Sequence, residues 1–292
     1  MNNKEFLLEI HKYIDEKYEL FLNYQKIVQD IYNVFFSICE KNNILHFAVA
    51  GSLLGIIRDN GCIPWDYDFD VAVLYKDLNK LLAALNNELP DDYYYVYKNN
   101  TRNYVAGCLR VCKKGFTYMA IHLDVFFCIG APLTTKSQIK FERKIRNVLS
   151  IRWSKNWRYH LPLEQLSIGD YLVEFIKKIR NLFYSEKRLN RIEHKICTKY
   201  DYDSSNVVGY FCYPMLCMDK KAIDKNVIVE KNGNKFSIPV NYKEVLRKRF
   251  GDNIDYLPIE ERFDEFYSVL NIVNKRQDFY IRREKWFILM KE

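Results

Sequence analysis

The chain has 292 residues, of which 49% are hydrophobic and 28% charged, and its formal net charge is +8. This composition is typical of a folded globular protein. We do not expect a membrane-spanning protein, because no stretch of the sequence approaches the ~20 consecutive apolar residues that a spanning helix needs. No apolar segment with a cleavage site follows the charged N-terminus, so we expect a cytoplasmic protein that at most binds peripherally to a membrane.

The segment from about residue 6 to residue 42 is predicted to be helical, in one long piece or two. Its apolar residues recur at the spacing of one helix face. They are Ile27, Ile31, Val34, Phe35 and Ile38. We interpret the segment as a packing helix that carries no chemistry.

An α/β pattern follows the N-terminal helix. Short apolar runs predict strands, and apolar periodicity predicts helices between them. The predicted strands are His46–Ala50, Asp68–Leu74, Tyr93–Tyr97, Cys108–Cys112 and Ala120–Phe127, and the predicted helices are Leu53–Asp59 and Leu78–Leu89. This order predicts an α/β (α+β) fold, in which a mixed sheet is flanked by helices.

The segment from Thr134 to about Tyr200 is predicted to be helical and is strongly basic. Residues 136–199 contain 16 Lys and Arg against six Asp and Glu. This excess suits an anionic partner, namely a phosphorylated donor, a nucleic acid or an anionic membrane surface, although solvated surface helices would explain it equally well. An apolar stripe in the segment is expected to pack on the sheet domain, and a basic amphipathic helix can also lie on a membrane. The stripe consists of Leu172, Phe175, Ile176, Ile179 and Phe183.

The last part of the chain is predicted to form a hairpin and helices. An Asn-Gly turn joins the predicted strands Val227–Glu230 and Lys235–Ile238. Asn241 and Glu244 have the spacing of a capping box at the start of a helix, and Gly251 is placed to end that helix.

No repeat or low-complexity linker divides the chain, so we predict a single domain of residues 1–292. A final helix is expected from about Glu260 to Trp286. The predicted parts are N-terminal helices in residues 1–42, an α/β core in residues 43–133, a basic helical insertion in residues 134–205, and a C-terminal hairpin with helices in residues 206–292.

Three aspartates alternate at the start of one predicted strand, within Trp-Asp-Tyr-Asp-Phe-Asp at residues 65–70. Successive side chains of a strand point to opposite faces, so Asp66, Asp68 and Asp70 are expected to share one face. Carboxylates this close repel one another unless a cation neutralises them. Hard oxygen ligands favour Mg²⁺ or Mn²⁺. Because apolar residues flank the cluster on both sides, we predict a metal site rather than a solvated acidic loop.

A fourth carboxylate, Asp124, lies within another apolar predicted strand. An unpaired charge in such a strand is costly. We therefore expect Asp124 to complete the metal site if the two strands are neighbours. His122 shares the face of Asp124 by strand parity and could position a substrate phosphate, although a buried structural histidine would explain it as well.

A phosphate-binding element is predicted at Gly51 and Ser52, between a strand and the start of a helix. Backbone N–H groups at a helix N-terminus favour phosphate, and glycine allows a ligand to approach closely. This pair is weak evidence alone and becomes strong about 15 residues ahead of an Asp-x-Asp strand.

These motifs together resemble the signature of the LicD-type phosphotransferase family, which includes bacterial phosphocholine transferases and the fukutin-related ribitol-phosphate transferases. The resemblance is carried by residues 51–58, 61–70 and 122–126, with patches at 236–242 and 249–258. Tyr67 and Cys128 depart from the family pattern, in which many members have another Asp at the first position and Pro at the second.

The resemblance implies a nucleotidyltransferase-like (polymerase-β-like) fold with a helical elaboration. It also implies transfer of a phospho-alcohol, such as phosphocholine or an alditol or glycerol phosphate, from a CDP-linked donor to a sugar hydroxyl, with release of CMP. The expected acceptor is a glycan or lipid-linked saccharide, such as a surface glycan, lipopolysaccharide or teichoic-acid-like polymer. Such an acceptor would suit a protein associated peripherally with the inner membrane face.

Each motif residue receives an expected role on this basis. Asp66, Asp68, Asp70 and Asp124 are expected to bind Mg²⁺ or Mn²⁺; Asp68, Asp70 and Asp124 are the catalytic candidates, with Asp124 a candidate general base. Guanidinium groups bind phosphate bidentately. The donor-phosphate candidates are Gly51, Ser52, Arg58 and Arg110, and the candidate substrate contacts are Trp65 and His122.

Three alternatives remain open. A true nucleotidyltransferase would move NMP from an NTP to a small molecule or RNA end with the same carboxylate cluster. A binding or regulatory protein could retain only the fold, but the presence of all four carboxylates argues against it. Nucleic acid is the less expected partner of the basic segment, and it would require steeply salt-dependent binding.

Overall fold

The computed structural model describes residues 3–63, 66, 68–156, 169, 173, 175, 176, 179 and 181–252. Trp65, Tyr67 and Leu172 lie outside the described residues. The helix predicted from about Glu260 to Trp286 lies outside them as well.

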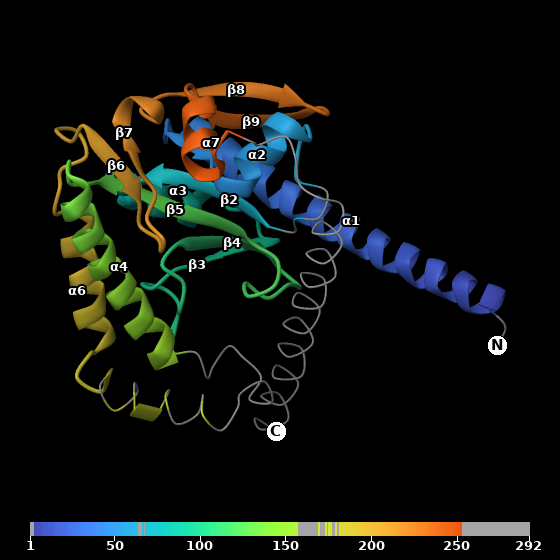
Figure 1. The fold of residues 1–292 in the computed structure, drawn as a ribbon, viewed down its shortest axis with the longest axis horizontal. Helices are drawn as coiled ribbons and strands as arrows, with labels where there is room; N and C mark the ends of the chain where they lie inside the picture. Colours follow the sequence, from blue (N-terminus) through green and yellow to red (C-terminus); the bar gives the residue numbers. More distant parts are fainter. Residues whose placement is uncertain are drawn as a thin grey trace.

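A mixed sheet of seven strands forms the centre of the described fold (Figure 1). Its strands are β1 (His46–Ala48), β2 (Phe69–Leu74), β3 (Tyr93–Val96), β4 (Leu109–Lys113), β5 (Leu123–Gly130), β6 (Val207–Tyr210) and β7 (Cys217–Asp219). The main order is β1-β2-β5-β4-β3, while β6 pairs with the far end of β5 and β7 with β6. Strands β2 and β5 run parallel, and the other neighbouring strands described are antiparallel.

Helices flank this sheet, and a separate hairpin lies beside it (Figure 1). The helices are α1 (Asn3–Lys41), α2 (Ala50–Arg58), α3 (Leu78–Glu88), α4 (Thr135–Asn156), α6 (Glu186–Cys197) and α7 (Tyr242–Phe250), with 3-10 turns η1 (Tyr75–Asp77) and η4 (Lys220–Ala222). The hairpin consists of β8 (Asn226–Lys231) and β9 (Asn234–Pro239). The predicted mixed sheet with flanking helices is confirmed.

The C-terminal half of α1 is held by its predicted apolar stripe. Ile27, Ile31, Phe35 and Ile38 are buried, as expected for one face of a packing helix. The ring of Tyr32 packs against β2 and β9, with centroid distances of 4.5 Å to Phe69 and 5.5 Å to Phe236. Helix α1 therefore fixes the strand that carries the predicted metal ligands, and its sequence stripe is confirmed.

Several local predictions need correction. Strands β6 and β7 were not predicted at all. Asn241 precedes α7 as expected, but its side chain makes no capping bond and instead donates to the carbonyl of Lys221 at 2.8 Å. Gly251 does follow α7, in the left-handed region at φ 77°.

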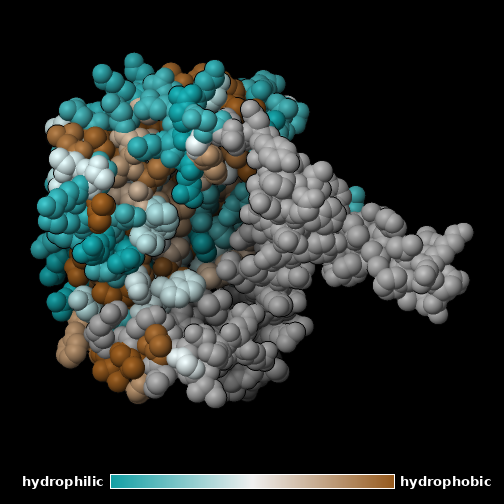
Figure 2. All heavy atoms as spheres, viewed as in Figure 1, coloured by the Kyte–Doolittle hydropathy of each residue, from teal (hydrophilic) through white to brown (hydrophobic). Residues whose placement is uncertain are grey.

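The apolar stripe of the basic segment does not pack on the sheet in the way that was predicted. Phe175 is 55% exposed and Phe183 is 76% exposed, and Ile176 and Ile179 are also exposed. Figure 2 shows hydrophobic side chains on the surface at the lower left, where Figure 1 places this segment. Among the described helices, none combines the length and apolar character needed to cross a membrane.

Candidate active site

The parallel pairing of β2 with β5 brings two predicted ligands together. Asp70 lies directly opposite Asp124 in the register of these strands. The two carboxylate-bearing strands are therefore neighbours, which is the condition under which Asp124 was expected to complete the metal site. Because the pair is parallel, the segments that lead into both strands also meet at one edge of the sheet.

Asp66 and Asp68 lie on the approach to β2 rather than within it. The strand begins at Phe69, so the prediction that it starts at Asp68 is wrong by one residue. The approach is clamped by Gln25 of α1, whose side-chain amide donates to the carbonyl of Ile63 at 2.8 Å and to that of Asp66 at 2.7 Å. Sequence reasoning missed Gln25, because a polar residue at the edge of a helix stripe carries no distinctive signal.

Gly51 provides the space in which the Asp66 carboxylate lies. A Cβ added at Gly51 would lie 2.9 Å from Oδ2 of Asp66, which is closer than van der Waals contact allows. Gly55 has a different purpose, since a Cβ there would meet backbone atoms of Gly61 at 2.5 Å and Ile63 at 2.7 Å. Gly51 thus leaves room for the Asp66 carboxylate, and Gly55 leaves room for the loop that carries Asp66.

The carboxylates of Asp68 and Asp70 are partly buried and lie close to like charges. Burial, followed by repulsion from Asp66 and Asp124, raises the pKa of Asp68 to about 8. Burial and the neighbouring carboxylates also raise the pKa of Asp70 well above its usual range. Among the described residues, no cation lies within ion-pair distance of either carboxylate. Without a bound cation, repulsion among these carboxylates therefore opposes the ionisation of Asp68 and Asp70.

Asp124 is the exception, because Arg110 of β4 neutralises it. Nε of Arg110 donates to Oδ1 of Asp124 at 2.7 Å. Burial raises the pKa of Asp124, but Arg110 and His122 outweigh burial and hold it below its usual range. Nη1 of Arg110 also donates to the carbonyl of Tyr118 at 3.0 Å. The side chain of Arg110 thus lies against Asp124 and is only 14% exposed.

His122 lies at the same edge, just before β5. Its Nε2 is 3.5 Å from Oδ1 of Asp124. Burial and then Arg110 lower the pKa of His122, so the ring is neutral at pH 7. The anionic carboxylate requires a donor, which assigns the proton to Nε2. Nδ1 is then a buried acceptor, and it has no hydrogen-bond partner among the described residues.

The start of α2 is tied directly to β2. The backbone N–H of Asp70 donates to Oγ of Ser52 at 2.7 Å, and the N–H of Val49 donates to the carbonyl of Asp70 at 3.0 Å. Ala50, the first residue of α2, has φ 48°, a left-handed conformation that is unusual for alanine. These contacts hold the predicted phosphate-binding element beside the carboxylates.

Arg58 and Trp65 are not brought into this group. Arg58 is at the opposite end of α2, where Nη2 lies 2.8 Å from Oδ2 of Asp59. Its role as a phosphate ligand stays a prediction. Trp65 lies outside the described residues.

The donor set suits a hard divalent cation. Its carboxylate oxygens are the ligands that Mg²⁺ and Mn²⁺ prefer, and a cation would offset the repulsion that raises the pKa of Asp68. Within the described part of the chain, no three His, Cys, Asp or Glu side chains are already placed as a ligand set. The fit to a cation therefore rests on charge and ligand chemistry rather than on preformed coordination geometry.

Two neighbouring strands that carry aspartates, with a glycine–serine helix start beside them, are the arrangement expected of a nucleotidyltransferase-fold domain. Residues 43–173 match the family model described as LicD/FKTN/FKRP, nucleotidyltransferase domain, and this part of the chain belongs to that family. The resemblance seen in the sequence motifs is thereby confirmed.

The lipopolysaccharide cholinephosphotransferase LicD of Haemophilus influenzae is a distant relative. It is 22% identical over 251 residues, which cover 82% of this chain and 92% of that protein. The similarity extends well beyond the residues that the family model matches. Both comparisons thus relate this chain to LicD-type proteins, and residues 43–173 to the nucleotidyltransferase domain of that family.

Proposed function

We propose that this protein is a cation-dependent phosphotransferase that moves a phospho-alcohol from a CDP-linked donor to a sugar hydroxyl. The observation that carries the proposal is the pairing of Asp70 with Asp124 across β2 and β5 within a LicD-family domain. The relative named lipopolysaccharide cholinephosphotransferase supports phosphocholine as one candidate group and a surface polysaccharide as the acceptor class. Glycerol and alditol phosphates remain candidates for the transferred group.

The carboxylates would hold the cation. Asp66, Asp68 and Asp70 are the ligands we propose, with Asp124 as the fourth. When bound, Mg²⁺ or Mn²⁺ would neutralise the negative charge that phosphoryl transfer concentrates on the phosphate oxygens. Arg110 keeps Asp124 anionic, which suits a ligand better than a general base. We therefore assign Arg110 a positioning role toward Asp124 in place of direct phosphate binding.

The start of α2 would receive a phosphate of the donor. Its backbone N–H groups are suited to an anion, and the hydrogen bond from Asp70 to Ser52 holds this helix end next to the cation ligands. In this arrangement Ser52 positions the two halves of the site relative to each other. Nδ1 of His122 has no hydrogen-bond partner among the described residues, which supports a contact with a substrate hydroxyl.

A lipid-linked acceptor would bring the protein to a membrane surface. Exposed apolar side chains within the basic segment, such as Phe175 and Phe183, support peripheral association. Basic residues in the same segment would favour anionic lipids.

The test is a panel of CDP-choline, CDP-glycerol, CDP-ribitol and CTP, each with Mg²⁺ and a purified surface polysaccharide. We expect CMP release from one CDP-alcohol, together with transfer of its phospho-alcohol to the polysaccharide. Pyrophosphate release from CTP would instead establish nucleotidyl transfer. If no donor turned over with any acceptor, the enzymatic proposal would fail.

A further inference from the structure

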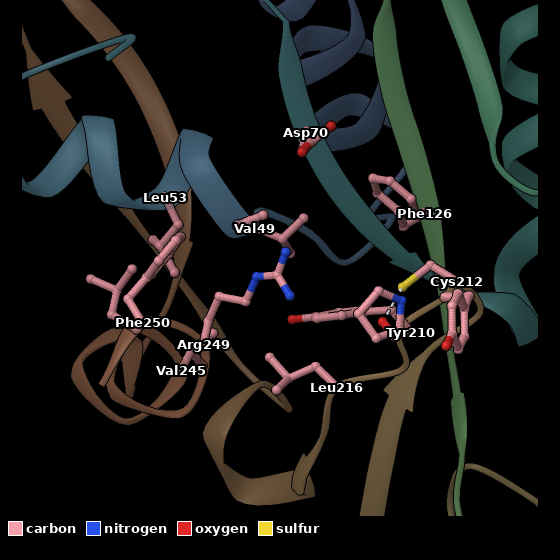
Figure 3. A pocket seen from close by; sticks show the side chains of 14 residues that line it. Val49, Leu53, Asp70, Phe126, Tyr210, Cys212, Leu216, Val245, Arg249 and Phe250 are labelled. Atoms are coloured by element: carbon pink, nitrogen blue, oxygen red, sulfur yellow. Dashed lines mark hydrogen bonds between the residues drawn. The ribbon is translucent and has the colours of Figure 1, made fainter. Parts of the chain in front are cut away.

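A cavity of about 190 Å³ adjoins the carboxylate cluster at Asp70 (Figure 3). Residues from several elements line it, including the start of α2, strands β2 and β5, the segment between β6 and β7, and helix α7. Its walls are mostly apolar and aromatic, with Leu53, Phe126, Tyr210 and Leu216 among them. A binding pocket for a whole drug-sized ligand is typically ~300–1,000 Å³, so this cavity suits a small group rather than an entire nucleotide-linked donor.

The cavity wall carries one acidic and one basic side chain. Asp70 comes from β2, and Arg249 comes from the last turn of α7. Figure 3 shows the guanidinium of Arg249 directed toward the interior of the cavity, with Asp70 at another side. Both charges act on the thiol of Cys212. Burial raises the pKa of this thiol to about 12; Arg249 opposes that rise and Asp70 adds to it. The cavity is thus charged at two places and apolar between them.

Arg249 differs from its neighbour Arg247 in how its charge is used. Arg247 lies in the same turn and pairs with Asp252, with Nε 2.7 Å from Oδ1. Within the described part of the chain, no carboxylate lies within ion-pair distance of Arg249. Arg249 is an exposed residue that water also reaches, but its guanidinium keeps its charge at neutral pH and is available to an anion that enters the cavity.

The hydroxyl of Tyr210 is a second polar group in the same cavity wall. It is buried and has no hydrogen-bond partner among the described residues. Buried hydroxyls are ordinarily hydrogen-bonded, and an unsatisfied one beside a cationic side chain suits a ligand with acceptor oxygens. Figure 3 shows Tyr210 between β6 and the interior of the cavity.

We propose that Arg249 and Tyr210 form the subsite for the phosphate of the transferred phospho-alcohol, whose small organic part occupies the apolar remainder of the cavity. This inference rests on the proposed function and adds a substrate subsite and two binding residues to it. The phosphate would lie between Arg249 and the cation held by the carboxylates. In this arrangement the nucleoside would lie outside the cavity.

Binding measurements with matched variants test the subsite. Titration calorimetry in Mg²⁺ would compare CDP-choline, CDP-glycerol and CMP binding to the wild type, R249Q, R249K and R247Q. A lost charge-assisted hydrogen bond weakens binding about 10- to 100-fold, so R249Q should lose that much affinity for the bound CDP-alcohol, with partial recovery in R249K. R247Q should stay within about twofold. CMP lacks the transferred phosphate, so R249Q should change its affinity little.

Tyr210→Phe gives an independent readout. Its hydroxyl has no hydrogen-bond partner among the described residues, so Y210F should leave the unfolding temperature unchanged while weakening CDP-alcohol binding. Equal affinities of R249Q and wild type for the CDP-alcohol, or an equal loss of CMP affinity, would overturn the subsite. Magnesium pyrophosphate is the donor-independent probe. If no CDP-alcohol binds, but R249Q and not R247Q weakens the binding of pyrophosphate, then Arg249 is a phosphate ligand and the proposed donor is wrong. If no CDP-alcohol binds and pyrophosphate either does not bind or binds R249Q and the wild type equally, then the proposed subsite is wrong as well.

Discussion

Two clusters of buried charge in this molecule are compensated in opposite ways. Between α4 and α6, Arg152 is fully buried and donates to Glu193 at 2.7 Å, Glu186 at 2.9 Å and Asn190 at 2.7 Å. Lys98 binds the other oxygen of Glu193 at 2.5 Å. Around β2 and β5, in contrast, Asp68 and Asp70 have no described cation within ion-pair distance.

The difference separates a structural cluster from a ligand-binding one. In the α4–α6 cluster the chain supplies every opposite charge, so the cluster fixes the two helices without a ligand. In the carboxylate cluster Arg110 pairs with Asp124, while among the described residues no cation lies within ion-pair distance of Asp68 or Asp70. A fold retains such an imbalance where something outside the chain restores neutrality. Substitutions in the two clusters should therefore have opposite consequences.

The largest effect is expected on activity. Asp70→Asn removes a proposed cation ligand that also borders the cavity. We expect a loss of at least about 10³-fold in CMP release, comparable to removing an important electrostatic stabiliser of a transition state. Asp91→Asn, on an exposed turn, is the matched control and should retain wild-type turnover. Activity of D70N within tenfold of wild type would show that Asp70 is not a catalytic ligand.

The second effect is on stability and belongs to the α4–α6 cluster. Glu193→Gln leaves Arg152 and Lys98 buried without their shared anion, which should cost about 3–5 kcal/mol of unfolding free energy. Urea denaturation measures the loss, and the exposed Glu230→Gln serves as the control. A change below about 0.5 kcal/mol would mean that water compensates these charges, and the contrast between the clusters would disappear.

The strands that carry the carboxylates could be predicted from the sequence, whereas the strands beside the cavity could not. Strands β2 and β5 were predictable because their apolar runs are long, and the aspartates within them stood out against that background. Strands β6 and β7 have only four and three residues, and Gly209 weakens the strand pattern of β6. The cavity wall that they support was therefore invisible in the sequence.

Partners of charged residues were also beyond sequence reasoning. Arg110 was assigned to phosphate because its residue type allows it, yet only the antiparallel register of β4 with β5 places it opposite Asp124. Arg249 was seen only as part of a family patch. Its direction into the cavity depends on how α7 packs against α2, which no local pattern encodes.

A moderate effect is expected from Gly51→Ala. The added Cβ would displace the Asp66 carboxylate, which lies at the end of a side chain and can move at little cost in stability. We expect Mg²⁺ affinity to fall about tenfold, the scale on which altered positioning of metal ligands is felt, with an unchanged unfolding temperature. Gly55→Ala is the informative partner, because its clash with backbone atoms should lower stability. Unchanged Mg²⁺ affinity in G51A would argue against Asp66 as a ligand.

The smallest expected effect is a change in stability caused by Asp68→Asn, and whether it is a gain or a loss decides between a ligand-binding and a structural cluster. Burial and neighbouring carboxylates raise the pKa of Asp68 from its ordinary value of 3.8 to about 8, so the metal-free fold loses stability as the pH rises between these values, and the loss levels off above pH 8. Asp68→Asn removes this repulsion and should stabilise the protein by about 1 kcal/mol in EDTA at pH 8.5, on the scale of one pKa unit. Thermal unfolding in EDTA and in excess Mg²⁺ measures the change. In Mg²⁺ the order should reverse, because only the wild type gains the full binding free energy. If D68N were destabilised in EDTA, as E193Q should be, then Asp68 would have a compensating partner within the chain and the carboxylate cluster would be structural.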